Sequence, residues 1–165
     1  MVYFSIIIVV YFSFTIYKPL KQAIILIGIQ ASGKTTFCQL YLQSGSHTHI
    51  SMDDVGTRNR EQEMLMQCIN DDKSFVIDNT NPEVADRKRY ISLAKAQGYE
   101  IVGIFFQSKI RDCIKRNELR GMKVPAKAIA STSNRLQLPT FEEGFDMLLF
   151  ARINEEGFDI QQWKN

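Results

Sequence analysis

The sequence has 165 residues with a formal net charge of +2, and 45% of its residues are hydrophobic and 23% charged. This length suits one domain with a substantial core and is too short for two, and the small net charge excludes a uniformly basic nucleic-acid-binding protein, so any basic surface must be local. The three cysteines are far apart and include no Cys-x-x-Cys pair, which argues against a disulfide scaffold or a zinc site built from cysteines and predicts a reducing, cytoplasmic location.

The first twenty residues form an apolar, aromatic stretch that carries no charge before Lys18. It lacks the basic start and the small-residue cleavage site of a secretory signal, and its length is at the lower edge of a membrane span. Three interpretations stay open: an extension outside the fold (including a start codon assigned too early), a membrane anchor, or an extra strand. Membrane association follows only if residues 1–20 insert, in which case Lys18 and Lys21 predict a cytoplasmic remainder. We expect residues 21–165 to form one domain.

A glycine-rich segment, Gly28-Ile-Gln-Ala-Ser-Gly-Lys-Thr-Thr36, matches the phosphate-binding pattern G-x-x-x-x-G-K-[ST] at every fixed position. An apolar run at residues 23–27 predicts a buried strand before it, and residues 36–43 predict a helix after it. Glycines let backbone N–H groups turn toward phosphate oxygens at the positive helix end. Lys34 is expected at the β- and γ-phosphates of ATP and Thr35 at Mg²⁺. The expected nucleotide contacts are Gly28, Gln30, Ala31, Ser32, Gly33, Lys34, Thr35 and Thr36.

Further strands and helices are predicted to alternate along the chain. Apolar runs predict strands at residues 48–52, 74–78, 100–106 and 147–152. Helical patterns lie at residues 61–70, 81–97, 109–120 and 125–136. Asn81 and Ser108 are expected N-caps, and residues 140–143 have capping-box spacing. Short apolar strands that alternate with helices predict an α/β fold, a three-layer sandwich with about five mostly parallel strands and helices on both faces.

Polar residues follow three of the predicted strands, and the carboxyl ends of parallel strands meet at one crevice. Asp78 ends an apolar strand, as a metal-holding carboxylate does, and Asp54 is a second candidate metal contact. Asp53 or Asp54 is placed to accept a proton from an attacking hydroxyl; the alternative is that the pair caps a helix. His47 and His49 are the only histidines, and too few other ligands lie nearby to favour a metal site, so we expect exposed loop residues.

A basic segment lies between residues 109 and 127. Its cations are Lys109, Arg111, Lys115, Arg116, Arg120, Lys123 and Lys127. Arg116 and Arg120 are four residues apart and are therefore expected on one helix face. Two guanidinium groups there, followed by a Gly-containing turn, suit a lid over the transferred phosphoryl group. The alternative is a solvated basic helix.

Residues 22–152 resemble the kinase domain of polynucleotide 5′-hydroxyl kinases, especially of the bifunctional kinase/phosphatases. The more particular segments are Val76-Ile-Asp-Asn-Thr-Asn-Pro82 and Pro139-Thr-Phe-Glu-Glu-Gly-Phe145; further matching segments are residues 28–37, 53–56, 87–90 and 115–120. The resemblance implies a P-loop NTPase fold that uses ATP and Mg²⁺. It implies that Asp53 is the general base for a nucleic-acid 5′-hydroxyl, with Lys34 and Thr35 at the phosphates and magnesium. It also implies that Arg120 and Arg116 are lid arginines and that Asp78 is the acid near the metal.

The sequence departs from this family in three respects. Gly56 stands where the phage branch has an arginine that contacts the substrate phosphate, and Arg58 or Arg60 is the available substitute. The Asp-x-Asp-Gly-Thr pattern of the phosphatase does not occur in these residues, and residues 54–75 offer little aromatic surface for stacking bases. Two other functions therefore stay open, a kinase acting on a small-molecule alcohol and a nucleotide-binding ATPase without an acceptor. No obligate protein partner is indicated.

Overall fold

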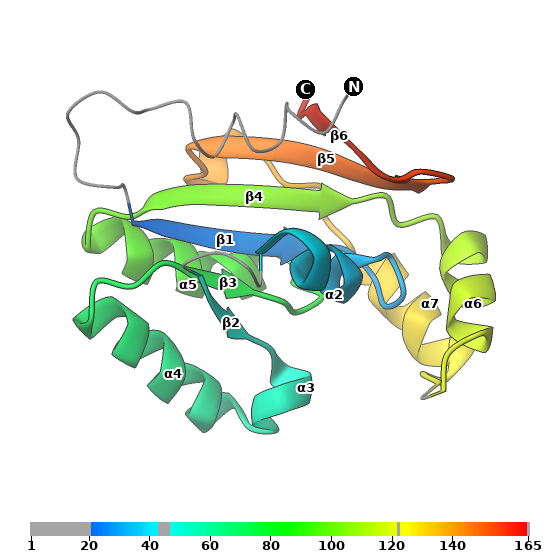
Figure 1. Cartoon of the computed structure of the whole chain (residues 1–165), viewed down its shortest axis with the longest axis horizontal. Coiled ribbons are helices and arrows are strands. Elements are labelled where there is room, and N and C mark those ends of the chain that lie inside the picture. The colour runs from blue at the N-terminus through cyan, green and yellow to red at the C-terminus, as the bar shows by residue number, and fades with distance from the viewer. Residues whose placement is uncertain (1–20, 43–46, 122, 165) are drawn as a thin grey trace.

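The computed structural model describes residues 21–42, 47–121 and 123–164 (Figure 1). The three interpretations of the first twenty residues therefore lie outside the described residues. Within the described part of the chain, no helix is both long enough and apolar enough to cross a membrane.

The core of the molecule is a six-stranded sheet with the order β2-β3-β1-β4-β5-β6. The strands are β1 (Gln22–Ile27), β2 (Thr48–Ile50), β3 (Phe75–Ile77), β4 (Glu100–Phe106), β5 (Met147–Asn154) and β6 (Gly157–Gln162). β1 to β5 pair in parallel, as predicted, and β6 adds to β5 in the antiparallel direction. The strand β6 was not predicted from the sequence, although Phe158 and Ile160 alternate with polar residues after the turn at residues 155–156.

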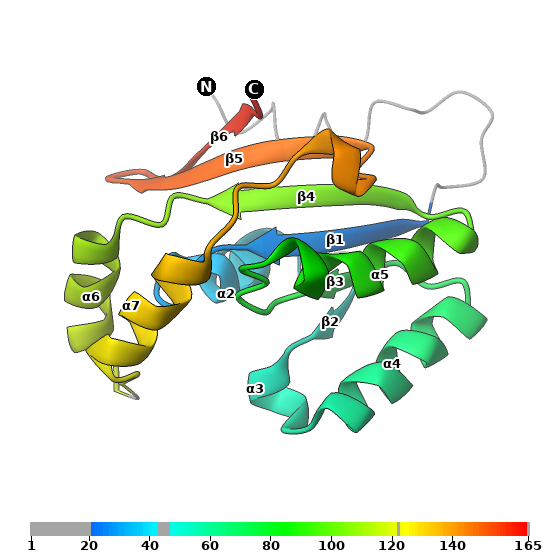
Figure 2. The ribbon, with the colours of Figure 1, turned by 180° about the vertical axis from the view of Figure 1, so that it is seen from behind.

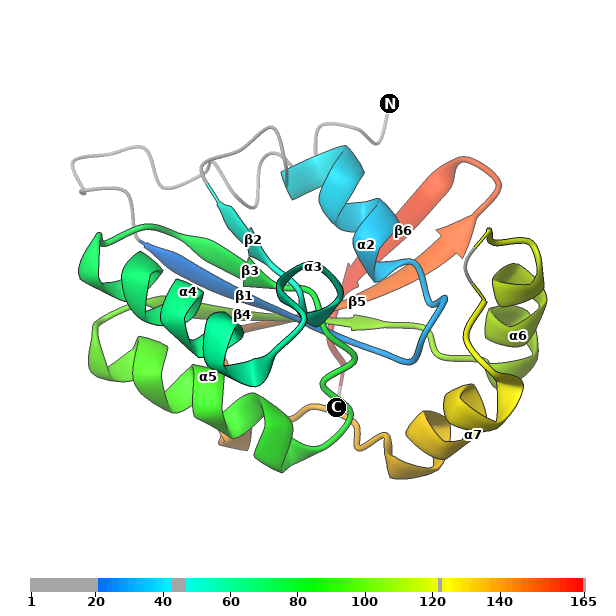
Figure 3. The ribbon, with the colours of Figure 1, turned by 90° about the horizontal axis from the view of Figure 1, so that it is seen from below.

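Helices cover both faces of the sheet, which confirms the predicted three-layer α/β fold (Figure 3). They are α2 (Lys34–Phe37), the π-helical η1 (Cys38–Leu42), α3 (Met52–Val55), α4 (Arg58–Asn70), α5 (Val84–Ala96), α6 (Ile110–Glu118), α7 (Ala126–Arg135) and the 3₁₀ turn η2 (Phe141–Glu143). Alternate residues of β1 face the two helical layers. Ile25 and Ile27 pack with α4 and α5, whereas Ile24 and Leu26 pack with α2 and η1. Burial on both faces explains the unbroken apolar run.

α6 and α7 stand beyond the carboxyl ends of β1 and β4 (Figure 2). A separate apolar cluster joins them to the glycine-rich loop: Ile29 and Ala31 from the loop pack against Cys113 of α6 and Ile129 of α7. This helical pair is therefore a packed part of the domain that lies beside the loop.

Two predicted helix caps differ from the structure. Asn81 does not cap a helix, because its backbone has a positive φ of 44° and its amide donates to the Leu26 carbonyl oxygen. The cap of α5 is Glu83, which forms a capping box with Asp86. Ser108 accepts a hydrogen bond from the Ile29 N–H and does not cap α6.

The segment Pro139–Phe145, which is particular to the resembled family, proves to be structural. Thr140 and Glu143 form the predicted capping box of η2. The Glu143 carboxylate also forms two hydrogen bonds, of 2.6 and 2.8 Å, with the guanidinium group of Arg87. Arg87 is fully buried and donates besides to the carbonyl oxygens of Asn81, Pro82 and Gln137. One buried cation thus ties the start of α5 to the segment that leads into β5.

Candidate functional site

The glycine-rich loop joins β1 to α2 in a strained backbone path. Gly28, Ala31 and Gly33 have positive φ angles of 153°, 59° and 106°. The Gly28 N–H donates to the Thr80 carbonyl oxygen at 3.0 Å, which fixes the loop to the segment after β3. Since the first N–H groups of a helix lack intrahelical acceptors, the loop and the start of α2 present donors for an anion.

Lys34 is buried in the centre of this loop. Its ammonium group donates to the carbonyl oxygens of Gly28 and Ile29, both at 2.9 Å, and to the Ser32 hydroxyl at 3.4 Å. Burial lowers the pKa of Lys34 to about 8, against the opposing effect of the nearby Asp78 carboxylate. The side chain is therefore a cation at neutral pH, and it is held by carbonyl oxygens at the point where phosphate oxygens are expected.

The structure brings the predicted charged residues together around Lys34. The carboxylates of Asp78 and Asp53 both raise the pKa of Lys34, and the guanidinium group of Arg120 lowers it. These groups come from the end of β3, from α3 and from the segment after α6. These charges therefore act on Lys34 from segments that lie at the carboxyl ends of the strands, where the strand-end rule predicts a ligand site.

Asp53 and Asp54 lie in the first turn of α3, and neither is its cap. Ser51 is the N-cap and its hydroxyl accepts from the Asp53 N–H at 3.3 Å. The interpretation of the aspartate pair as a helix cap is thus wrong. Both side chains are exposed, so their charges are available for contacts with a ligand.

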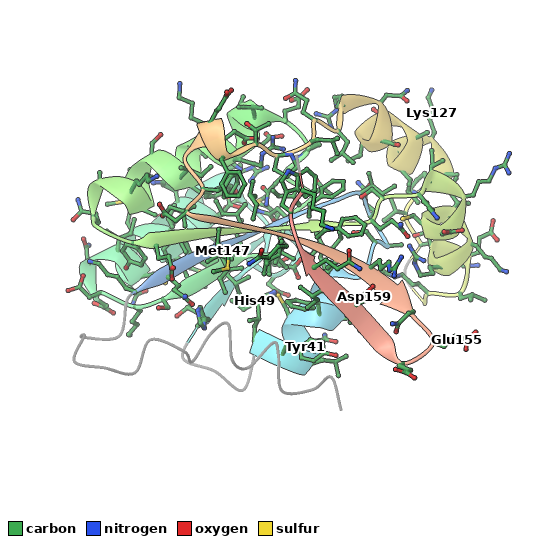
Figure 4. The ribbon with its side chains drawn as sticks, turned by 90° about the horizontal axis from the view of Figure 1, so that it is seen from above. Tyr41, His49, Lys127, Met147, Glu155 and Asp159 are labelled. Atoms are coloured by element: carbon green, nitrogen blue, oxygen red, sulfur yellow. The ribbon has the colours of Figure 1, made fainter. Side chains whose placement is uncertain are left out.

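The expectation that His49 is an exposed loop residue is also wrong. His49 lies on β2 and is half-buried on the side of the sheet where η1 packs (Figure 4). Its Nε2 atom lies 3.1 Å from the Asp78 carboxylate and its Nδ1 atom 3.3 Å from the Asp54 carboxylate. The hydrogen bond with Asp78, opposed by burial, raises the pKa of His49. His49 therefore connects the two aspartates that were expected to contact magnesium.

A buried carboxylate, Glu61, organises the flank of α3. Glu61 accepts from the Tyr90 hydroxyl at 2.8 Å and from the Asn79 amide at 2.5 Å. The Asn79 side-chain oxygen in turn accepts from the Met52 N–H at 2.9 Å. This chain of hydrogen bonds fixes the start of α3, which carries Asp53, to β3, α4 and α5.

Two arginines complete this polar network. The network as a whole was not predicted from the sequence. Arg58 donates to both oxygens of Glu61, and Arg89 donates to the Tyr90 hydroxyl and lies 3.6 Å from Glu61. The Nε atom of Arg89 is buried without a hydrogen-bond partner. From the sequence, Glu61 was predicted only as part of an amphipathic helix, because the neighbouring residues in the sequence do not show which distant side chains form hydrogen bonds with its carboxylate.

The two predicted lid arginines occupy different positions. Arg116 on α6 donates from Nε to the Ala31 carbonyl oxygen at 2.8 Å, so it braces the glycine-rich loop. Arg120 lies beyond the end of α6, is exposed, and acts on Lys34 through its charge. The two arginines therefore do not share a helix face, which corrects that expectation. Gln30 adds a second link through a 3.1 Å hydrogen bond to Thr132 on α7.

The fold and this site define a P-loop NTPase. The chain belongs to the AAA domain family, whose model matches residues 24–139. Membership implies nucleotide binding. Among curated relatives, the "Bifunctional polynucleotide phosphatase/kinase" of Schizosaccharomyces pombe is 29% identical over 130 residues, which are 76% of this chain and 32% of that protein. The "Putative bifunctional polynucleotide phosphatase/kinase" of Acanthamoeba polyphaga mimivirus is 31% identical over 159 residues, which are 90% of this chain and 38% of that protein.

The chain thus spans about a third of the length of these curated relatives. Their names agree with the family that the sequence motifs resemble. Among solved structures, a gluconokinase from Sinorhizobium meliloti 1021 superposes with a TM-score of 0.60 at 14% identity, over 82% of this chain and 85% of that one. This likeness confirms the P-loop fold.

Gly33 offers a test of the loop geometry. A Cβ atom at Gly33 would lie 2.8 Å from Ile153 and 3.0 Å from Phe158 on the β5–β6 hairpin, at a φ of 106°. Gly33→Ala is expected to lower the free energy of unfolding by about 1–3 kcal/mol, because backbone strain adds to a close contact with the packed Phe158 ring, whereas the terminal methyl group of Ile153 belongs to an exposed side chain and can move. Gly98→Ala is the control, since Gly98 has a φ of 73° with open space around it. Urea denaturation of both variants measures the difference, and equal losses would contradict the predicted clash.

Proposed function

We propose that residues 21–165 form an ATP- and magnesium-dependent kinase that phosphorylates the 5′-hydroxyl group of a nucleic acid. The observation that carries the proposal is the position of the exposed Asp53 in the first turn of α3. The Met52–Asn79 hydrogen bond holds this turn to the segment after β3, and the phosphate loop is fixed to the same segment through Gly28 and Thr80. The printed names of the curated relatives, which are polynucleotide phosphatase/kinases, support nucleic acid as the acceptor class.

In the proposed reaction the 5′-oxygen of the acceptor forms a bond to the γ-phosphorus of ATP. The bond from that phosphorus to the β,γ-bridging oxygen breaks, and ADP leaves with the electron pair. Asp53 accepts the hydroxyl proton as general base. Lys34, Arg120 and the loop N–H groups stabilise the charge on the transferred group, so positioning and electrostatics supply most of the rate. Arg116 acts through Ala31 and keeps the loop in shape.

The donor set fits magnesium. Asp78 supplies a carboxylate whose side chain is 1% exposed, and Thr35 supplies an exposed hydroxyl at the start of α2. Carboxylate and hydroxyl oxygens are ligands that Mg²⁺ takes together with the phosphates of a nucleotide. Asp54 is the third candidate; its carboxylate contacts Nδ1 of His49, whereas Asp78 contacts Nε2, so the imidazole ring lies between the two carboxylates. When bound, the ion would neutralise charge on the β- and γ-phosphates.

For acceptor recognition we assign Arg58 and Arg89, which take the place of the arginine missing at Gly56. Both guanidinium groups gather at Glu61 with exposed edges, their side chains being 52% and 38% exposed. They lie on the flank that fixes α3 through Asn79. A phosphate of the acceptor strand there would receive charged hydrogen bonds from the exposed parts of both guanidinium groups.

Arg89→Met is expected to raise the KM for a 5′-hydroxyl oligonucleotide about tenfold, the effect of losing one charged hydrogen bond, with the KM for ATP unchanged. The salt dependence of oligonucleotide binding should also weaken, since one phosphate contact is lost. Lys88→Met, at the neighbouring exposed position of α5, is the matched control. If the two substitutions had equal effects, Arg89 would contribute only non-specific positive charge and no specific phosphate contact.

The proposal is tested by transfer of labelled γ-phosphate from ATP to a 5′-hydroxyl oligonucleotide, compared with a panel of small alcohols. Gly56 and the low net charge favour a small-molecule alcohol as the second candidate acceptor. Transfer to a small alcohol without transfer to the oligonucleotide would establish that candidate. ATP hydrolysis that neither acceptor nor Asp53 substitution changes would indicate an ATPase without an acceptor.

A further inference from the structure

Three side chains of different chemistry meet where η1, β2 and the end of β3 come together. They are the thiol of Cys38, the imidazole of His49 and the carboxylate of Asp78, and one potential ligand atom of each lies within 4.8 Å of the others. Cys38 and Asp78 are buried, whereas His49 is half-buried. The cluster is therefore formed inside the fold, with one side open to solvent through the histidine.

The arrangement suits a metal that prefers nitrogen and sulfur. The Nε2 atom of His49 and the Oδ2 atom of Asp78 are 3.1 Å apart, close to the separation of about 3.3 Å that two ligands have on one tetrahedral Zn²⁺ ion. A thiol is not a ligand that Mg²⁺ selects, but sulfur, imidazole and carboxylate all bind Zn²⁺. We propose that Cys38, His49 and Asp78 form a binding site for Zn²⁺, separate in chemistry from the magnesium site.

Asp54 provides the supporting contact that such a site needs. In zinc sites, the ring nitrogen of histidine that does not bind the metal commonly donates to a carboxylate, which fixes the orientation of the ring. The Nδ1 atom of His49 lies 3.3 Å from the Asp54 carboxylate. A proton on Nδ1 would leave Nε2 free to bind the metal beside Asp78. Three protein ligands and an open fourth position for water complete a tetrahedral ion.

Binding must release a proton. Burial raises the pKa of the Cys38 thiol to about 12, so the free site holds a neutral thiol at pH 7. When the ion binds, the sulfur–hydrogen bond breaks, the proton passes to solvent and the sulfur electron pair binds the metal. Any proton on Nε2 of His49 leaves in the same way. The apparent affinity for Zn²⁺ therefore rises with pH.

Zinc in this site would engage Asp78, the carboxylate assigned above to magnesium. It follows that Zn²⁺ inhibits phosphoryl transfer, a consequence that rests on the proposed function. The binding of the metal itself does not rest on it. Cys38 lies immediately after the helix that begins at the phosphate loop, and its Sγ atom lies within 4.8 Å of a carboxylate oxygen of Asp78.

The test is a Co²⁺ titration of the untagged full chain under reducing conditions, followed by visible and near-ultraviolet absorption. We expect one equivalent of Co²⁺ to give a tetrahedral spectrum with a thiolate charge-transfer band that Zn²⁺ abolishes. Cys38→Ala should remove that band, and His49→Gln should weaken binding at least about tenfold. Cys68→Ala, at a buried cysteine on α4, should leave the spectrum unchanged. Circular dichroism verifies that each variant is folded.

A folded wild-type chain without the thiolate band, or a Cys38→Ala variant that keeps it, would overturn the proposed site. The activity assay then tests the consequence separately. Cys38→Ala should retain magnesium-dependent transfer and need at least about ten times more Zn²⁺ for half-inhibition. If the protein transfers no phosphate to any acceptor, the proposed function fails while the cobalt spectrum still decides whether the site exists.

Discussion

Asp53→Asn is expected to lower phosphoryl transfer to a 5′-hydroxyl oligonucleotide by about 10²–10⁴-fold, the range that general-base catalysis contributes. The substitution keeps the shape of the side chain and removes its ability to take a proton. α3 should keep its structure, because Ser51 caps it and Asn79 holds the Met52 N–H without help from the Asp53 side chain. ATP should still bind, because the phosphate loop and Lys34 are unchanged.

Asp54→Asn is the matched control for this experiment. Asp54 lies one residue further along the same turn, and its carboxylate is directed to His49. We expect a smaller loss of transfer than for Asp53→Asn. Single-turnover rates at saturating ATP and a separate nucleotide-binding titration distinguish loss of chemistry from loss of binding. A fully active Asp53→Asn protein would refute the assignment of the base. Inactivity of Asp54→Asn alone, at saturating Mg²⁺ and with nucleotide binding retained, would transfer that role to Asp54.

The sequence predicted the sheet and its central loop well because local patterns determine them. Apolar runs such as residues 23–27 are long enough to identify buried strands, and the glycine-rich motif fixes the connection between β1 and α2. Asp53 and Asp78 could be placed in one crevice because the ends of parallel strands meet there. β6 was missed because its alternation of Phe158 and Ile160 with polar residues is weak in a short segment at the edge of the sheet.

What the sequence did not predict depends on contacts between distant residues. His49 looked like a loop residue because its partners Asp54 and Asp78 become visible only when β2 pairs with β3. Glu61 and Arg87 sit in helices that read as ordinary charged helices, yet both are buried. Burial of a charge is stable only when it is paired, and pairs such as Arg87 and Glu143, 56 residues apart, leave no local pattern.

Arg87 and Glu143 form a buried ion pair between α5 and η2. Glu143→Gln is expected to lower the free energy of unfolding by about 3–5 kcal/mol, because a buried guanidinium group then loses its counter-charge. Arg87→Met should cost at least as much, since it leaves the Glu143 carboxylate unpaired and three carbonyl oxygens without their donor. Urea denaturation followed by circular dichroism measures both values.

The double variant Arg87→Met/Glu143→Gln should lose less stability than the sum of the two single variants, because each single substitution leaves an uncompensated buried charge and the pair leaves none. Lys73→Gln is the control, since its pair with Asp71 is exposed and should contribute at most about 1 kcal/mol. Strict additivity, or losses no larger than that of Lys73→Gln, would contradict the role of the pair. The expected coupling instead gives the segment 139–145 a structural role: Glu143 pairs with the buried Arg87, which fixes the start of α5, the helix that also carries Arg89 and Tyr90.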